Sequence, residues 1–142
     1  MKQPQTLTQK RRARGRRGNA LVESALVLWP FILIVFGLAQ IGYVIWSDST
    51  LAYAVDAGAR YASLNGARST TPATVDSIRQ MVRDSAVGLE TAQITVNVVW
   101  TPSNRPGSTV EIEAVYPVRT LVQFVWPTPF SLRSRTQMLV VN

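Results

Sequence analysis

Residues 18–46 read GNALVESALVLWPFILIVFGLAQIGYVIW, and this stretch decides how the chain is organised. Residues 25–46 carry no charged side chain. A helix over those 22 residues is ~33 Å long at ~1.5 Å per residue, about the thickness of the hydrocarbon core of a bilayer. We therefore expect residues 19–46 to form a membrane-spanning helix.

The net charge of +7 comes from the short arm before this helix. Seven of the 15 basic side chains lie in residues 1–18, which hold no acidic side chain, so the remaining chain is neutral overall. A basic arm before an apolar helix keeps the N-terminus in the cytoplasm and sends the following chain across the membrane. We expect membrane lipid as a partner and no nucleic acid, and we expect Gly15 and Gly18 to break helical structure in the arm.

The absence of cysteine and histidine excludes several classes of function. Disulfides, metal sites built from thiolates or imidazoles, and a Ser-His-Asp triad are all impossible without these residues. Both lysines, Lys2 and Lys10, lie in the arm, and the acidic residues are scattered. We therefore expect no enzymatic activity, no catalytic or metal site, and no cofactor.

The chain after the apolar segment predicts two helical stretches. Helical periodicity continues to Asn65, and Gly66 fits a C-terminal stop. Thr71 and Pro72 predict the N-cap and first residue of a second helix that runs to about Val87 and ends at Gly88. Two sequence features, Pro30 and Gly37, are expected to bend or loosen the first helix.

The period then changes to two, which predicts three strands. Residues 94–100 and 110–116 alternate around a Pro- and Gly-containing loop, as in a hairpin that Pro117 ends, and residues 132–141 alternate again. Glu111 and Glu113 share one face of their strand, where we expect solvent and the cross-strand partners Arg133 and Arg135. The apolar loop around Trp126-Pro127, with Phe124 and Phe130, either closes the core or is an exposed interaction patch. The fold class is α+β.

Glu23 is the chemically unusual residue, because it lies near the start of the apolar helix. A carboxylate in hydrocarbon costs ~2.5–3.5 kcal/mol, and such residues usually have a partner. Cleavage after Gly18 would leave an ammonium on Asn19, which could pair with the Glu23 carboxylate of a neighbouring subunit and set their register. The alternative is a glutamate at the cytoplasmic interface that snorkels to water.

The glycine before this cut and the glutamate at the fifth mature position resemble the class III signal of type IV pilins and pseudopilins. The wider string resembles the TadE-like family of the tight-adherence (Flp) pilus system. The residues that carry this resemblance are Gly18, Glu23, Ala25 to Pro30, Phe36-Gly37, Gly58 to Ala62, and Tyr116-Pro117 followed by Arg119.

The resemblance implies a type IV pilin-like fold and a role as a minor pilin or pseudopilin in assembling a pilus that supports surface adhesion. Residues 1–18 would be a leader removed by a prepilin peptidase, residues 19–46 the filament-core helix, and residues 47–142 an extracytoplasmic domain. Its partners would be the other major and minor pilins and the inner-membrane assembly platform. The protein would lie in the bacterial inner membrane and, after processing, in the pilus or on the cell surface.

Two other functions remain open on the sequence. An uncleaved single-pass protein could use its outer domain as a binding module in a pilus or secretion assembly complex, and an anchored enzyme is a third, disfavoured reading. Pro30 either bends the helix for extraction and packing or is a tolerated kink. Gly37 and Gly42 either let helices approach closely or are ordinary membrane-helix glycines. Residues 58–62 are expected to pack against the sheet first and to contact a neighbour second.

Overall fold

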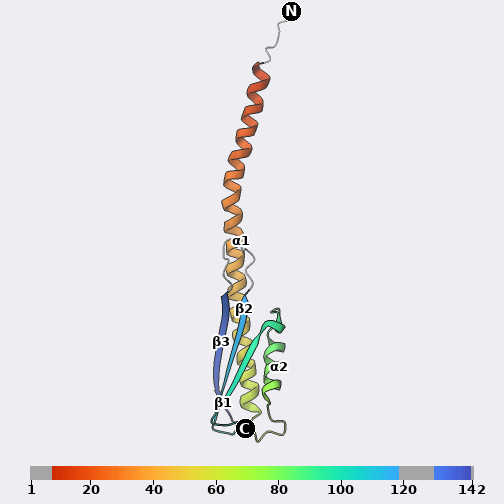
Figure 1. Cartoon of the computed structure of the whole chain (residues 1–142), viewed down its shortest axis with the longest axis vertical. Helices are drawn as coiled ribbons and strands as arrows, with labels where there is room; N and C mark the ends of the chain where they lie inside the picture. The colour runs from red at the N-terminus through yellow and green to blue at the C-terminus, as the bar shows by residue number, and fades with distance from the viewer. Residues whose placement is uncertain (1–7, 119–129, 142) are drawn as a thin grey trace, which may run out of the picture. The chain divides into compact units, whose positions relative to one another are not determined.

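The computed structural model describes residues 8–118 and 130–141, and their side chains from residue 21 onward. The architecture is α+β, as expected (Figure 1). Two compact units divide at residues 39 and 40, and each is considered by itself. The elements in chain order are α1 (Thr8–Leu64), α2 (Val75–Ser85), a short 3-10 helix η1 (Thr91–Gln93), β1 (Thr95–Thr101), β2 (Thr109–Val118) and β3 (Phe130–Leu139).

Helix α1 begins at Thr8 and continues through Gly15, Gly18 and Pro30. The expectation that glycines would break the arm was wrong. A single glycine costs a helix only about 1 kcal/mol, and the arginines and alanine around these two favour helix. From Leu21 onward α1 is long and apolar enough to cross a membrane, with a mean hydropathy of 2.3 in its most apolar window.

The second unit is built on the part of α1 that follows Gln40. One stripe of α1 at spacings of three and four residues is buried against α2 and the sheet. At Gly58 the helices approach so closely that an added Cβ would lie 2.5 Å from Cγ2 of Val82 on α2. The strands run beside this part of α1 (Figure 1). The stripe consists of Ser47, Leu51, Ala54, Val55, Gly58, Ala59 and Ala62.

Helix α2 starts three residues later than the sequence predicted. Its N-cap is Thr74, whose side chain accepts from the backbone N–H of Ser77 at 3.1 Å, while the Ser77 hydroxyl accepts from the N–H of Thr74 at 2.9 Å. This reciprocal capping box, and not the Thr71-Pro72 pair, decides the start, because it satisfies two helix-end donors at once. The helix ends at Ser85, before the expected Val87.

The sheet has the order β1-β2-β3 with both pairs antiparallel. Strand β2 continues through Pro117 to Val118, so the prediction that this proline ends the strand was wrong. Strand β1 pairs with β2 only as far as Val115, so Pro117 lies where β2 has β3 on one side alone. A strand tolerates a missing N–H at such an edge.

The expected charged face of the sheet is confirmed. Arg135 contacts Glu111 at 2.6 Å, and Arg133 contacts Glu113 at 3.2 Å, each along a diagonal between β3 and β2. The predicted apolar loop around Trp126-Pro127 with Phe124, and the residue Arg119, lie outside the described residues.

Candidate functional site

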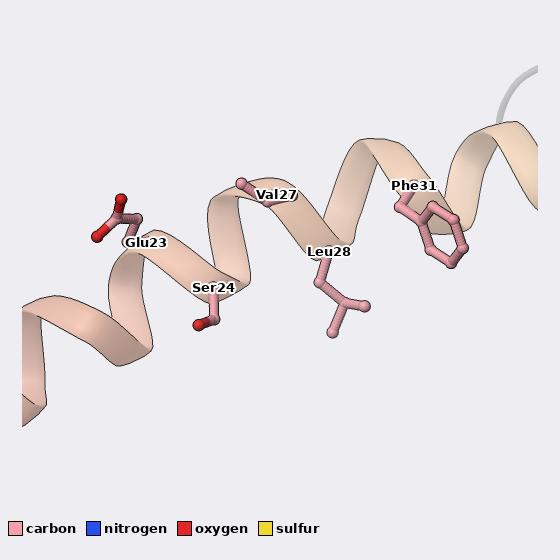
Figure 2. Close-up of a pocket in the computed structure, with 5 residues that line it drawn as sticks. All are labelled: Glu23, Ser24, Val27, Leu28 and Phe31. Carbon is pink, nitrogen blue, oxygen red and sulfur yellow. The ribbon is translucent and has the colours of Figure 1, made fainter.

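Glu23 lies on α1 within a shallow surface that also includes Ser24, Val27, Leu28 and Phe31 (Figure 2). These positions recur at spacings of one, three and four residues, so they share neighbouring faces of one helix. Figure 2 shows the Glu23 carboxylate directed away from the ribbon, with the Ser24 hydroxyl beside it and the apolar Val27, Leu28 and Phe31 further along the helix. The arrangement offers one acidic group at the edge of a surface made for lipid or for other helices.

The apolar side chains around Glu23 are largely exposed, which is unfavourable in water. Leu21 is 72%, Val27 64% and Phe31 60% exposed, and every residue from 21 to 31 is exposed. Covering one such side chain is worth about 1.5–3 kcal/mol. This face therefore requires a cover of lipid or of apolar helices.

The other predicted site residues are spread along α1. The Gly18–Asn19 peptide bond lies inside the helix, and Asn19 precedes Glu23 by one turn on the same side. A Cβ added at Gly37 or Gly42 would meet nothing within 4 Å, so neither glycine is required for packing against the described part of this chain. Pro30 lies within the helix. The structure thus groups Glu23 with its helical neighbours and leaves Pro30, Gly37 and Gly42 elsewhere along α1.

A second cluster, which sequence reasoning missed, surrounds Trp46 in the second unit. We call it the Trp46 cluster: Tyr43, Trp46, Val87, Gly88 and Tyr116. Gly88 adopts a φ of +83°, and a Cβ there would lie 2.6 Å from Cη2 of Trp46. The rings of Tyr43 and Trp46 have centroids 6.1 Å apart. Tyr43 and Trp46 lie at the end of the predicted membrane-spanning segment, residues 19–46, whereas Gly88 was predicted only to end the second helix.

Burial raises the pKa of Tyr116 above its usual value of 10, and a side-chain hydrogen bond with Tyr43 raises it further. A backbone hydrogen bond with Glu90 acts in the opposite direction. The hydrogen bond between the two tyrosines links α1 to β2 at the point where α1 enters the second unit.

The ionic groups of the sheet pair with one another across β2 and β3. A hydrogen bond from Arg135, assisted by Gln137, lowers the pKa of Glu111 below its ordinary 4.5. This favours the ionised carboxylate, which suits an ion pair and not a general acid. Across residues 8–118 and 130–141, no group of three or more acidic side chains converges as a metal site would require.

Residues 18–60 match the model of a protein family described as TadE-like protein. The match begins at Gly18 and includes Glu23, Pro30 and Gly37, so the resemblance read from these motifs is confirmed over this segment. Tyr116-Pro117 lies outside it. No curated protein matches the chain, and no solved structure does. The match associates the protein with the tight-adherence pilus system, and its apolar helix is consistent with a membrane anchor.

Proposed function

We propose that the protein is a minor pilin or pseudopilin that takes part in assembling a tight-adherence pilus. The observation that carries this proposal is the Glu23 carboxylate on an exposed helical face that is apolar apart from Ser24. Lipid covers that face in the membrane, and the helices of neighbouring subunits cover it in a filament. Head-to-tail contacts of one helix with the next build an open assembly when the rotation does not close.

Glu23 makes the membrane less favourable for this helix than the filament. The apolar side chains around it are satisfied equally by lipid and by helices, whereas the carboxylate costs ~2.5–3.5 kcal/mol in hydrocarbon. An ammonium on Asn19 of the adjacent subunit offsets that cost, because each buried charge is costly without the other. Glu23 therefore favours transfer from the membrane into the filament and sets the axial register between subunits.

Cleavage by a prepilin peptidase after Gly18 creates this ammonium. The bond lies in a helical segment, so the peptidase has to unwind it locally to reach the carbonyl. Glycine lowers helix stability by about 1 kcal/mol relative to alanine, and the arm carries two glycines, at 15 and 18. The cut also removes seven basic side chains, which otherwise hold the N-terminus at the cytoplasmic surface.

The remaining partners are the other pilins of the system and the inner-membrane assembly platform. The second unit faces the extracytoplasmic side, in keeping with the basic arm before the helix, and the assembled pilus supports adhesion to surfaces. A structural role, and not an enzymatic one, is supported by a sequence without histidine or cysteine and by surface ion pairs on the sheet.

The first test is the N-terminal sequence of the protein from native membranes, with and without the peptidase. An N-terminus at Asn19 that depends on the peptidase is the expected result. Gly18→Ala should block processing and leave insertion intact. Gly15→Ala is the matched control, because it makes the same change in the same arm three residues from the bond. Normal processing of Gly18→Ala would refute the assignment of the cleavage site to the Gly18–Asn19 bond.

The second test separates the charge of Glu23 from its size. Glu23→Gln should be inserted and processed but recovered poorly with assembled pili. Glu23→Asp keeps the carboxylate on a shorter side chain, so it should be recovered with assembled pili better than Glu23→Gln. Equal recovery of Glu23→Gln and the unmodified protein would refute the pairing role.

The alternative function is an uncleaved anchor whose outer domain binds a partner in a pilus or secretion assembly complex. The observation that favours it is that the second unit has its own core, built from α1 after Gln40, α2 and the sheet. An N-terminus at Met1 in both strains would support this alternative over the pilin.

A further inference from the structure

The Trp46 cluster lies close to wherever the apolar helix leaves the membrane. Trp46 follows Gln40, the first residue of the second unit, by six residues of helix, which is ~9 Å along the axis. Any membrane that the preceding apolar residues cross therefore has its surface near this cluster.

The cluster presents apolar surface from a part of the chain that the sequence would not place near the membrane. Val87 follows α2 and is 73% exposed, although its neighbour Gly88 lies against the indole of Trp46. Trp46 is itself 46% exposed, and Ile45 beside it is 61% exposed. Gly88 has a positive φ, which glycine adopts without strain, and this backbone conformation lets it approach the Trp46 ring.

The chemistry of the cluster matches the region between lipid headgroups and acyl chains. Tryptophan and tyrosine combine an apolar body with a polar tip, which is why they gather at membrane surfaces. Tyr43 and Tyr116 join their hydroxyl groups by a hydrogen bond, while the Trp46 ring and Val87 remain exposed. The cluster thus holds Gly88 against an interfacial aromatic, and the exposed Val87 is the residue that precedes Gly88 in the chain.

We propose that the exposed part of the Trp46 cluster, Trp46 and Val87, is a membrane-contact surface, by which the second unit rests on the phospholipid bilayer that its own helix crosses. Val87 enters the boundary between headgroups and acyl chains together with Trp46. The inference rests on the membrane span of the proposed function, and it is independent of cleavage and of filament assembly. It sets the distance of the domain from the membrane, and these contacts have to break when the subunit leaves the bilayer.

An exposed valine at the opposite end of the second unit, Val141, serves as a control for Val87. Val141 is 67% exposed, and its N–H donates to the carbonyl of Ser63, 17 residues of α1 after Trp46 and so ~26 Å further along that helix. Val87 and Val141 are thus the same residue type, similarly exposed, at opposite ends of one compact unit.

The chain has no cysteine, so single-cysteine variants are labelled without background. The full-length protein carrying Val87→Cys, Val141→Cys or Ile34→Cys is labelled with an environment-sensitive nitrobenzoxadiazole fluorophore and reconstituted in phosphatidylcholine vesicles. Phosphatidylcholine with a nitroxide near the headgroup, or near the bilayer centre, then quenches labels by depth. Interfacial side chains lie about 5–10 Å into the headgroup and acyl boundary, so the shallow nitroxide should quench the label at position 87 at least about twofold more than the label at position 141.

The label of the Ile34→Cys variant, within the apolar helix, reports insertion and should be quenched most by the deep nitroxide. If that label is quenched but the label at position 87 is no more affected than the one at position 141, the membrane-contact surface is overturned and the span stays intact. An unquenched label at position 34 would overturn both the span and the contact surface. Quenching at position 87 by the deep nitroxide more than by the shallow one would also contradict an interfacial position.

Discussion

Replacing Gly58 tests how closely α1 and α2 pack. The new Cβ would lie 2.5 Å from Cγ2 of Val82 but 3.7 Å from Cδ1 of Ile112 and 3.8 Å from Cγ2 of Ile78, which are ordinary contact distances. The conflict is thus confined to one methyl group of a fully buried valine. That methyl cannot swing aside at low cost, because β-branched side chains in helices have one strongly preferred rotamer.

The expected change in the free energy of unfolding is the difference between two opposing effects. Overpacking a core costs about 1–3 kcal/mol, and replacing glycine by alanine within a helix gains about 1 kcal/mol. Gly58→Ala should therefore reduce the free energy of unfolding by about 1 kcal/mol. Val82→Ala removes the obstructing methyl, so in that background Gly58→Ala should instead raise the free energy of unfolding by about 1 kcal/mol. The expected coupling between the two sites is about 2 kcal/mol.

The assay is urea unfolding of the full-length chain, the two single variants and the double variant in a mild detergent, followed by near-ultraviolet circular dichroism. Gly42→Ala is the control, because a Cβ there meets nothing within 4 Å, and it should not destabilise the protein. An equal loss of stability from Gly58→Ala in the unmodified chain and in the Val82→Ala background would refute the packing argument. So would a loss in the Gly42→Ala control of the size seen at Gly58.

Three further variants test other contacts of the second unit by the same unfolding measurement. Gly88→Ala should lower stability by about 1–2 kcal/mol, because alanine resists the positive φ and its Cβ would meet Trp46; an unchanged midpoint would contradict this. Ser47 is fully buried and its hydroxyl has no hydrogen-bond partner within the described chain, so Ser47→Ala should raise stability by about 1 kcal/mol, and a loss of stability would show that the hydroxyl has a partner after all. The pKa of Glu111 is lowered by Arg135, so the carboxylate stabilises the fold above pH 4.5 and that contribution is lost as the pH falls through the lowered pKa. Glu111→Gln should therefore lose less stability than the unmodified chain on acidification, and parallel pH profiles would argue against the ion pair.

The candidate site could be read from the sequence because its signals are local. A glutamate in an apolar run, a glycine five residues before it and a basic arm are visible without any tertiary contact. The ion pairs of Glu111 and Glu113 were also predictable, because strand alternation puts neighbouring charges on one face. The start of α2 was missed because two threonines compete for the cap and only Ser77 decides between them.

The apolar helix, the second helix and the three strands of the α+β domain are predictable from local patterns, because hydrophobic periodicity and the length of an uncharged run are properties of neighbouring residues. The close approach of α2 to α1 at Gly58, and the position of Gly88 against the ring of Trp46, become visible only in the folded chain. Such contacts join residues that are far apart in the chain, and they depend on which side chains leave room for one another. Packing of that kind is set by shape across the whole core, which no local pattern encodes.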